Sequence, residues 1–398
     1  IKMKKFLIAV FVVCVFVQVS LSQWQPDTNG IGYLSERSLI ASGGNLYTGT
    51  FNAGVFKSTN NGNNWTQTSL NNQFVFSLAA SGSNVYAGTY GNGVYLSTNN
   101  GSTWAPTALT GQFVVSLAVS GSYIFAGVFY NGVYVSSNNG STWTQTTLNN
   151  RDVYSLAVSG SNIYAGTYQN GIYVSSNNGS TWTQTSLNNQ TVQTMLINGS
   201  DIYAGTYYSA GIYKSTNNGT TWSPGSLPNR SIYSFAMIGS TIIAGSDGYG
   251  VYISSDNGAS WVQKNEGFTG GPKVYGLCVL NSYIFAATDY SEYRRGINEL
   301  NGVELISAEI PETFSLSQNY PNPFNPVTNI KFSIPKTGNV KLAVYDITGK
   351  EVMILLNGNL SAGTYNNDLD ASKLASGVYF YRLETEEYQN VKKMILVK

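Results

Sequence analysis

Residues 58–65 read STNNGNNW, and this eight-residue phrase, named the box here, recurs five times further along the chain. The later copies are STNNGSTW at 97–104, SSNNGSTW at 136–143 and 175–182, STNNGTTW at 215–222 and SSDNGASW at 254–261. The box tryptophans are Trp65, Trp104, Trp143, Trp182, Trp222 and Trp261, spaced by 39, 39, 39, 40 and 39 residues. A fixed period of about 40 residues is typical of propellers and solenoids, so the box predicts a repeat fold.

Each repeat also carries four strand-like pieces, which are clearest in the second repeat. They read FVFSLAAS at 74–81, NVYAGTY at 84–90, GVYLST at 93–98 and, after the box, WAPTAL at 104–109. Alternating β-branched and aromatic residues between Gly and Asn turns predict four antiparallel strands per repeat and an all-β fold.

Seven first strands accompany only six boxes. The seventh unit, which begins at 273–280, has no box, whereas an unpaired tryptophan, Trp24, stands near the N-terminus. We therefore expect the segment around Trp24 to supply the outer strand of the seventh blade and to close a seven-bladed β-propeller over residues 23–302.

The turns of such blades sort onto two faces. The box and the turn between the first and second strands share one face, the box face. The turn between the second and third strands and the links between blades lie on the opposite face, the variable face. Within the box we expect Asn60 to bond the backbone two residues on, the glycine to supply a positive φ, and the tryptophan to pack between blades.

The six boxes resemble the Asp-box, or bacterial neuraminidase repeat, although five carry Asn in place of Asp. Proteins with this repeat include sialidases, some plant-polysaccharide hydrolases and non-enzymatic propellers similar to the photosystem II assembly factor. The resemblance implies that the box is structural, and it leaves the activity open.

Composition excludes several function classes. Charged residues make up 10% of the chain and the net charge is +1 without a basic run, so we expect neither nucleic acid nor an anionic membrane as a partner. The chain has no histidine, which excludes Ser-His and Cys-His nucleophile pairs and the usual zinc ligands. We expect no metal and no cofactor.

The N-terminus reads as a secretory signal. Basic residues at 2–5 precede an apolar run at 6–19, and Ser20 and Ser22 occupy the small-residue positions before Gln23. This pattern predicts a signal peptide over 1–22 with cleavage after Ser22. A single membrane anchor is the alternative, but the apolar run is shorter than the ~20 residues that a span needs. After cleavage we expect no integral membrane segment.

A second domain follows a change of composition after Gly302. We expect residues 303–312 to form a linker and 313–398 to form a small Ig-like antiparallel β-sandwich. The six predicted strands lie at 329–334, 340–345, 351–356, 364–369, 377–384 and 389–397.

Residues 312–398 resemble the type A C-terminal sorting domain of the type IX secretion system of Bacteroidetes. The matching segments are PNPFNP at 321–326, YDITGKEV at 345–352, LASGVYFYRL at 374–383 and KKMILVK at 392–398. The candidate sorting residues are Pro321, Asn322, Pro323, Phe324, Asn325, Pro326, Gly377, Tyr379 and Lys393. The resemblance implies export through the periplasm of a Gram-negative cell, handling by the type IX machinery and a sorting protease, and release or attachment at the outer surface.

The candidate ligand-binding residues lie on the variable face. The first position of its turn is occupied by Phe51, Tyr90, Phe129, Tyr168, Tyr207, Asp247 and Asp289. Arg151 and Arg230, with Gln73, Gln112 and Gln190 at the equivalent positions, are expected nearer the axis. Aromatic rings beside amides suit sugar rings or extended peptides. The alternative is that the aromatic residues pack between blades.

Two functions remain open from the sequence. The first is a non-catalytic propeller that binds or adheres to an extracellular glycan or surface protein. The second is a secreted glycoside hydrolase of the sialidase-like or polysaccharide-degrading type, which needs two carboxylates about 5–9.5 Å apart. Asp152, Asp247 and Asp289 lie in loops of the variable face, but no spacing selects a pair. The sequence therefore favours binding and assigns no catalytic residue.

Overall fold

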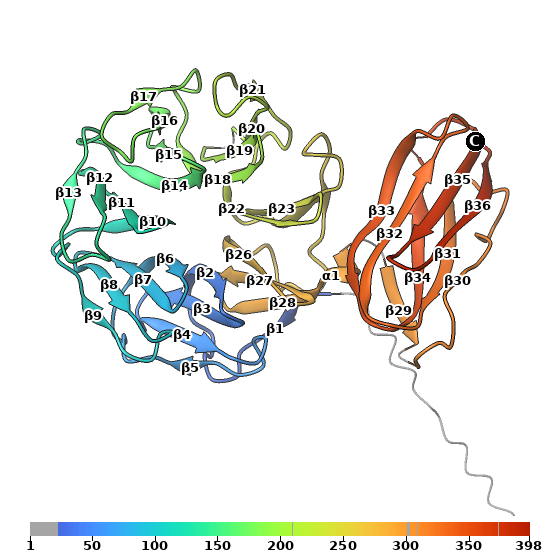
Figure 1. Cartoon of the computed structure of the whole chain (residues 1–398), viewed down its shortest axis with the longest axis horizontal. Coiled ribbons are helices and arrows are strands. Elements are labelled where there is room, and N and C mark those ends of the chain that lie inside the picture. Colours follow the sequence, from blue (N-terminus) through green and yellow to red (C-terminus); the bar gives the residue numbers. More distant parts are fainter. Residues whose placement is uncertain (1–22, 209, 301–302, 308, 373) are drawn as a thin grey trace, which may run out of the picture.

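The computed structural model describes residues 23–398 except 209, 301–302, 308 and 373. The predicted signal peptide, residues 1–22, lies outside the described residues. Among those described, seven four-stranded antiparallel sheets form a ring, and two further four-stranded sheets form a separate sandwich (Figure 1). The predicted all-β fold, a propeller followed by a small sandwich, is confirmed.

The blades follow one another along the chain, each running from the innermost strand to the outermost. The first three blades are β2 (Glu36–Ser42), β3 (Asn45–Thr50), β4 (Val55–Ser58) and β5 (Thr66–Gln67); β6 (Val75–Ser81), β7 (Asn84–Thr89), β8 (Gly93–Ser97) and β9 (Ala105–Pro106); and β10 (Val114–Ser120), β11 (Tyr123–Val128), β12 (Gly132–Ser136) and β13 (Thr144–Gln145). The next three are β14 (Val153–Ser159), β15 (Asn162–Thr167), β16 (Gly171–Ser175) and β17 (Thr183–Gln184); β18 (Val192–Asn198), β19 (Asp201–Thr206), β20 (Ile212–Ser215) and β21 (Ser223–Pro224); and β22 (Ile232–Ile238), β23 (Thr241–Ser246), β24 (Gly250–Ser254) and β25 (Val262–Gln263). First strands of neighbouring blades contact one another and surround the axis (Figure 1).

The seventh blade combines both ends of the propeller sequence. Its strands β26 (Val274–Leu280), β27 (Tyr283–Thr288) and β28 (Glu292–Gly296) are completed by β1 (Gln25–Pro26), which pairs antiparallel with β28. Trp24 is 1% exposed, its ring stacks on Phe268 at 4.8 Å between centroids, and its indole N–H donates to the Lys264 carbonyl at 2.7 Å. The expectation that the Trp24 segment closes the ring is confirmed.

Within the box, the serine and the first asparagine organise the turn. The Ser58 hydroxyl oxygen accepts the backbone N–H of Gly62 at 2.9 Å, and Asn60 Oδ1 accepts the N–H of Asn64 at 2.9 Å. The same two bonds recur in the other five boxes. The expected bond two residues on is therefore wrong: the side chain reaches four residues on, because Asn61 as well as Gly62 has a positive φ and the turn is wider.

Box tryptophans pack between blades, as expected. Trp143 of the third blade packs against a cluster that contains Tyr86 of the second blade, and its indole N–H donates to Thr107 Oγ1 at 3.2 Å. Trp65 is 3% exposed, whereas the other box tryptophans are half-buried. The box thus holds successive blades together rather than presenting a ligand site.

Backbone hydrogen bonds place the turns on the two predicted faces. On the variable face, the Gly54 N–H donates to the Gln73 carbonyl of the following link at 3.0 Å. On the box face, the Asn100 N–H donates to the Ser83 carbonyl at 2.9 Å. The third strand β28 runs toward the box face, so the chain leaves the propeller there, through the short helix α1 (Ile297–Leu300).

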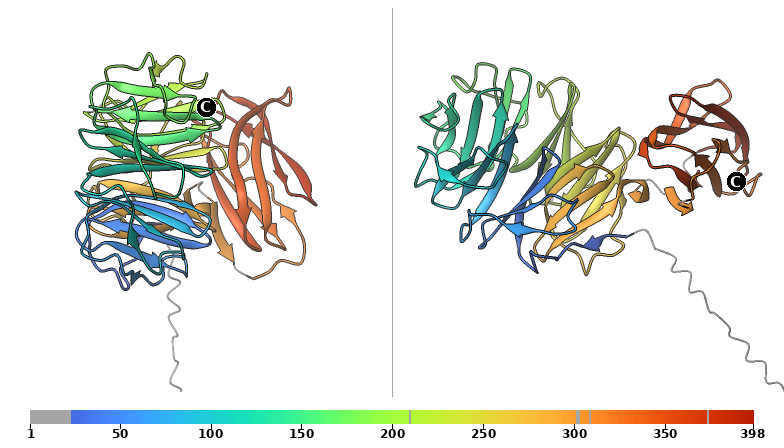
Figure 2. Two further views of the ribbon diagram at one scale, coloured as in Figure 1. Left: turned by 60° about the vertical axis from the view of Figure 1, so that its left-hand side comes forward. Right: turned by 60° about the horizontal axis from the view of Figure 1, so that its bottom comes forward.

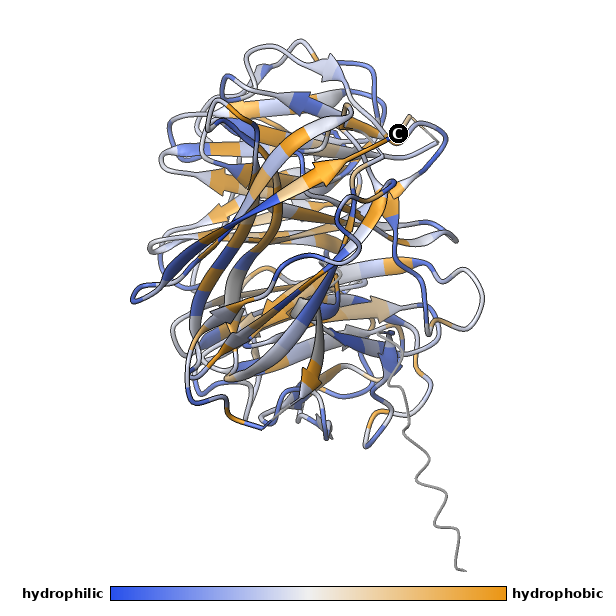
Figure 3. Ribbon diagram, turned by 90° about the vertical axis from the view of Figure 1, so that its right-hand side faces the viewer, coloured by the Kyte–Doolittle hydropathy of each residue, from blue (hydrophilic) through white to orange (hydrophobic). Residues whose placement is uncertain are grey.

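The C-terminal sandwich stands beside the ring, next to the seventh blade (Figure 2). One sheet contains, in spatial order, β29 (Val303–Ser307), β34 (Gly363–Asp370), β31 (Val327–Ile334) and β30 (Ser315–Leu316). The other contains β33 (Glu351–Leu360), β32 (Gly338–Tyr345), β35 (Gly377–Glu384) and β36 (Gln389–Leu396). Hydrophobic and hydrophilic residues alternate along the strands (Figure 3), and the inward ones, including Phe332, Leu342 and Tyr381, are fully buried.

Two strands of the sandwich were not expected. Residues 303–312 were predicted to be a linker, but Val303–Ser307 forms β29, which pairs antiparallel with β34. β29 forms because β34 would otherwise be an edge strand with one side unpaired. Ser315–Leu316 forms the other addition, β30, which pairs with β31.

The candidate sorting residues at 321–326 lie against the last strand. The Phe324 N–H donates to the Ile395 carbonyl at 3.0 Å, and the Val397 N–H donates to the Phe324 carbonyl at 2.9 Å. Asn322 Oδ1 accepts the Ile395 N–H at 2.9 Å, and Phe324 is 3% exposed. Gly377 begins β35, the Tyr379 hydroxyl donates to the Ala375 carbonyl, and Lys393 is exposed on β36. The motif therefore joins the start of the sandwich to its end.

Candidate binding face

The seven turn residues proposed from the sequence occupy equivalent places on the variable face. Each follows a second strand and donates its backbone N–H to the link that precedes the first strand of the same blade. For Tyr90 the acceptor is the Phe74 carbonyl at 2.9 Å, and for Asp247 it is the Ser231 carbonyl at 3.0 Å. The exposed fractions of Phe51 and Tyr90 are 39% and 54%, whereas Phe129, Tyr168 and Tyr207 are half-buried. The turns thus place aromatic rings at the surface of one face.

A β-bulge in every first strand adds a second set of residues to this face. The register shifts by one residue near the start of all seven first strands, leaving one residue of each without a cross-strand partner. The bulged residues are Arg37, Phe76, Val115, Tyr154, Gln193, Tyr233 and Tyr275, and all are half-buried. Because a bulge redirects the side chain, these residues do not follow the alternation of side-chain direction along the rest of their strands.

Ring contacts between the turn, link and bulged residues close a circle around the axis. On one side the centroid distances are 4.7 Å for Phe51–Phe74, 6.1 Å for Phe74–Tyr90, 4.4 Å for Tyr90–Phe113, 5.3 Å for Phe113–Phe129 and 5.9 Å for Phe129–Tyr154. On the other they are 6.2 Å for Tyr154–Tyr168, 4.3 Å for Tyr207–Tyr208, 6.0 Å for Tyr207–Tyr233 and 5.3 Å for Tyr233–Tyr275. The Tyr168 and Tyr208 hydroxyls lie 3.5 Å apart, and the Arg37 guanidinium bridges Tyr275 to Phe51 at 4.1 and 5.1 Å. We name this circle the aromatic ring.

The aromatic ring has two chemically different arcs. The phenylalanine arc comprises Phe51, Phe74, Phe76, Phe113 and Phe129, and the tyrosine arc comprises Tyr154, Tyr168, Tyr207, Tyr208, Tyr233 and Tyr275. Burial and the neighbouring Asp152 carboxylate raise the pKa of Tyr154 to about 12, and burial and Asp247 raise the pKa of Tyr233 as well. The Tyr154 and Tyr233 hydroxyls therefore stay protonated and able to donate hydrogen bonds at neutral pH.

Two tyrosines on the ring are held in an unusual backbone conformation. Tyr130 and Tyr208 have φ values of 66° and 56°, and their side chains are 70% and 64% exposed. Glycine occupies the equivalent positions, Gly91 and Gly248, in two other blades. A bulky residue in the left-handed region is strained, and such strain tends to gather at functional sites.

The acidic residues of this face are each engaged in structural contacts. Asp247 forms an ion pair with Lys273 at 3.0 Å and accepts the Tyr233 hydroxyl at 3.3 Å. Asp152 accepts the Tyr130 N–H at 2.7 Å, and Asp289 accepts the Lys273 N–H at 3.1 Å. These contacts tie loops of the variable face together, and Lys273 contacts both Asp247 and Asp289.

The arginine and glutamine positions do not all lie where they were expected. The Arg230 Nε–H donates to the Tyr252 hydroxyl on the third strand β24 at 3.1 Å, and its guanidinium stacks on Tyr249 at 3.8 Å. Arg230 thus points away from the axis, because its link runs inward from the outermost strand and the side chain extends back over the blade. Arg151 is exposed and bonds only the adjacent Asn150 carbonyl among the described residues, at 3.1 Å.

Sequence reasoning missed the bulged residues that belong to the aromatic ring. Gln73 and Gln112 bond turn residues Asn92 and Asn131 at 2.8 Å, whereas the bulged Arg37 reaches the aromatic ring. A partial signal was present, since the second residue of the seven first strands is aromatic in four of them, at Phe76, Tyr154, Tyr233 and Tyr275.

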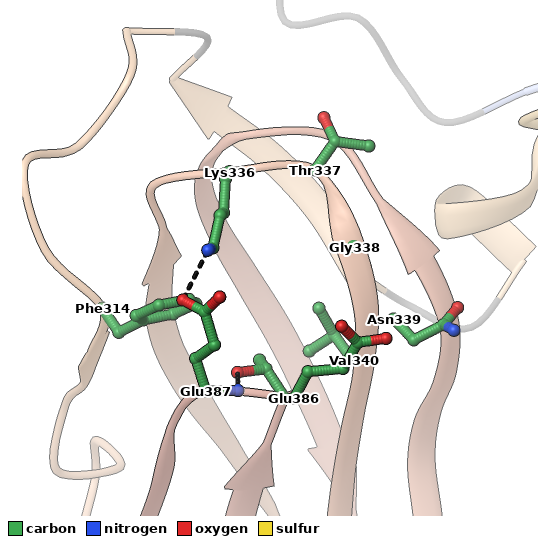
Figure 4. Close-up of a pocket in the computed structure, with 9 residues that line it drawn as sticks. Phe314, Lys336, Thr337, Gly338, Asn339, Val340, Glu386 and Glu387 are labelled. Atoms are coloured by element: carbon green, nitrogen blue, oxygen red, sulfur yellow. Dashed lines mark hydrogen bonds and ion pairs between the residues drawn. The ribbon is translucent and has the colours of Figure 1, made fainter.

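Two concave features lie elsewhere on the molecule, away from the aromatic ring. A hollow of about 260 Å³ at one end of the sandwich is lined by Phe314, residues 336–340 and residues 385–387, and Lys336 pairs with Glu387 across it (Figure 4). A groove of about 310 Å³ lies on the box face beside Trp104. Over the described ranges no cluster of His, Cys, Asp and Glu side chains could hold a metal ion, and no helix has the length and apolarity needed to cross a membrane.

Fold and site together define a class: a β-propeller with a circle of aromatic residues on one face, followed by a small β domain. Residues 318–398 match the sequence family of the secretion system C-terminal sorting domain, and residues 105–246 match the DUF6242 beta propeller domain. The sorting-domain match supports a secreted or cell-surface protein handled by type IX secretion machinery in Bacteroidetes-type bacteria.

Solved structures show the same fold at low identity. YCF48 from Cyanidioschyzon merolae is 13% identical, with a TM-score of 0.57 over 69% of this chain and 98% of that one. The WD40 propeller domain of Doa1 is 13% identical, with a TM-score of 0.56 over 69% and 96% of the two chains. The computationally designed Ika8 protein is 12% identical, with a TM-score of 0.52 over 66% and 83%. No curated protein matches the chain at a significant level.

Proposed function

We propose that this secreted protein is a non-catalytic binding or adhesion propeller whose variable face holds an extracellular glycan or surface protein. The observation that carries the proposal is the closed aromatic ring, which passes through all seven blades on the face opposite the box. Rings, hydroxyls and amides on one open face supply apolar area and hydrogen bonds together. The strained backbone of Tyr130 and Tyr208 supports the assignment of the binding site to the variable face.

The remaining parts of the chain serve export and scaffolding in this proposal. The six boxes are Asp-box-type structural turns. Residues 1–22 are a signal peptide removed after Ser22, and a sorting protease removes the C-terminal domain at the outer surface. A hydrolase is less well supported, because the acidic residues of the variable face are occupied by Lys273 and backbone N–H groups.

The test is a binding screen with the full chain against immobilised glycans and isolated outer-surface proteins. A triple variant, Tyr90→Ser, Tyr130→Gly and Tyr208→Gly, removes three of the most exposed rings of the face while glycine fits the two left-handed positions. We expect the wild-type chain to retain at least one ligand and the variant to lose it without a change in circular dichroism.

Two outcomes would contradict the proposal. Ligand retention by the triple variant would show that the ligand does not bind on the variable face. Turnover of a polysaccharide or sialoside that disappears in Asp247→Asn would make the protein a hydrolase instead.

A further inference from the structure

The part of the phenylalanine arc beside Arg37 is apolar, and the Tyr90 hydroxyl lies further along the arc, where the Tyr90 ring contacts Phe74 and Phe113. Phe51 and Phe74 stack at 4.7 Å with 12° between their planes, and they are 39% and 37% exposed. Phe76 and Phe113 continue the surface at 5.0 Å. Sugar hydroxyls placed on these rings would lose water without gaining partners, which is costly. Exposed clusters of aromatic side chains instead mark sites where proteins bind.

Arg37 lies at the end of this arc and has no carboxylate partner among the described residues. Its guanidinium is sandwiched between the rings of Phe51 at 5.1 Å and Tyr275 at 4.1 Å. The Nε atom is buried, the side chain also interacts with the Tyr275 hydroxyl, and no carboxylate among the described residues lies within ion-pair distance. By contrast, Lys273 on the same face is neutralised by Asp247 at 3.0 Å.

Burial makes this cation a strong site for an anion. A guanidinium lying partly out of water pairs with a carboxylate in a directional, two-pronged way.

We propose that the variable face binds a polypeptide segment in which an aromatic or aliphatic side chain lies beside an Asp or Glu carboxylate. The apolar side chain covers the phenylalanine arc, the carboxylate pairs with Arg37, and the tyrosine hydroxyls bond the peptide backbone. This inference rests on the proposed function, and it selects the class of ligand. An acidic glycan would satisfy Arg37 but would leave the phenylalanine arc without suitable contacts.

The experiment uses the purified full chain as bait against a bead library of random octapeptides. We expect selected beads to be enriched in Phe, Trp, Leu or Ile next to Asp or Glu. A selected peptide is then measured by fluorescence anisotropy against wild type, Arg37→Gln and Arg37→Lys. Lys331→Gln is the control, because it removes the same charge from an exposed site on the sandwich. Oligogalacturonate is measured alongside as an acidic glycan.

The expected result is at least a tenfold loss of peptide affinity in Arg37→Gln, a smaller loss in Arg37→Lys and none in Lys331→Gln. Exchanging the peptide's own Glu for Gln tests the same contact without altering the protein, so a folding defect in Arg37→Gln leaves the proposal testable. Affinity that ignores both changes would overturn it. Oligogalacturonate binding without peptide binding would also overturn it while leaving the proposed function intact, and binding of neither probe nor any other ligand would refute both.

Discussion

At the scale of single residues, the turns that carry Tyr130 and Tyr208 adopt a backbone conformation that the fold alone does not favour for tyrosine. Tyr130 and Tyr208 adopt left-handed φ values that glycine adopts freely at Gly91 and Gly248. Such strain costs roughly 1–3 kcal/mol per residue. A scaffold alone would favour glycine here, and the proposed function accounts for the two exposed tyrosines by contacts with a ligand.

This explanation predicts that the Tyr130→Gly and Tyr208→Gly double variant folds as well as the wild type. Relief of strain offsets the extra freedom that glycine gives the unfolded chain, about 0.5–1 kcal/mol per residue. We expect the free energy of unfolding in urea to change by less than ~1 kcal/mol. A loss above ~2 kcal/mol would mean that the two rings stabilise the fold instead.

A second residue-scale feature is a buried group of carboxyls where the first and seventh blades meet. Glu36 and Glu292 are both 0% exposed, and Asp27, with 7% exposure, forms an ion pair with Arg294 at 3.4 Å. Burial raises the pKa of Glu36 to about 7 and that of Asp27 to about 6, and burial with the Glu36 charge holds the pKa of Glu292 well above its usual range.

These pKa values predict that the propeller loses stability as the pH rises. The folded state binds protons more tightly than the unfolded chain, whose glutamates have a pKa near 4.5. The stabilisation is therefore complete below about pH 4.5 and is lost as the pH rises through about 7. Urea denaturation at pH 5, 6, 7 and 8 should show this decline, and Glu36→Gln should reduce it. A flat profile for the wild type would contradict the assignment.

At the scale of elements, two residues of β1 close a ring of seven sheets. Trp24, which precedes β1, is the anchor, because it is buried, stacked on Phe268 and hydrogen-bonded to Lys264. Cleavage after Ser22, as we predict, leaves Trp24 as the second residue of the mature chain. The signal peptide boundary and the closing strand therefore fit together without spare residues.

Truncating this anchor should open the ring. We expect Trp24→Ala to lower the free energy of unfolding by about 3–5 kcal/mol, the usual cost of removing a buried aromatic side chain. Tyr33→Ala is the matched control, because Tyr33 is 81% exposed and its removal should cost less than ~0.5 kcal/mol. Equal effects of the two substitutions on urea denaturation would show that β1 does not close the ring.

The sequence predicted elements well where a pattern repeats and poorly where it does not. The 39-residue period and the unpaired Trp24 were sufficient for the blades and their closure. β29 was missed because its five residues pair with β34, about 60 residues away, and no repeated sequence pattern indicates this pairing. The bulged Arg37 was missed as part of the site because a bulge adds a residue without interrupting the apolar pattern.

At the scale of the whole molecule, the two domains divide the work. The C-terminal sandwich carries the match to secretion sorting domains, and the propeller carries the aromatic ring. The chain leaves the propeller on the box face, after β28, so the sandwich is attached away from the variable face. The sorting domain and the proposed binding face therefore do not share a surface.

This division predicts the form of the exported protein. Intact mass spectrometry of the secreted material should show loss of residues 1–22 and of the region beyond about Phe314. The exposed segment 309–312, which includes Ile310 at 73% exposure, lies between β29 and β30 and is accessible to a protease. Full-length protein confined to the cytoplasm would contradict both the sorting and the processing.

The central claim, that ligands bind on the variable face, is tested most directly by comparing two triple variants of the full chain. Tyr90→Ser, Tyr130→Gly and Tyr208→Gly strip the variable face, while Ser102→Tyr, Ser141→Tyr and Ser180→Tyr add three rings to exposed positions of the box face. The measurement is the dissociation constant for one ligand from the screen. We predict at least a tenfold increase for the first variant and no change for the second, and the reverse order would contradict the account.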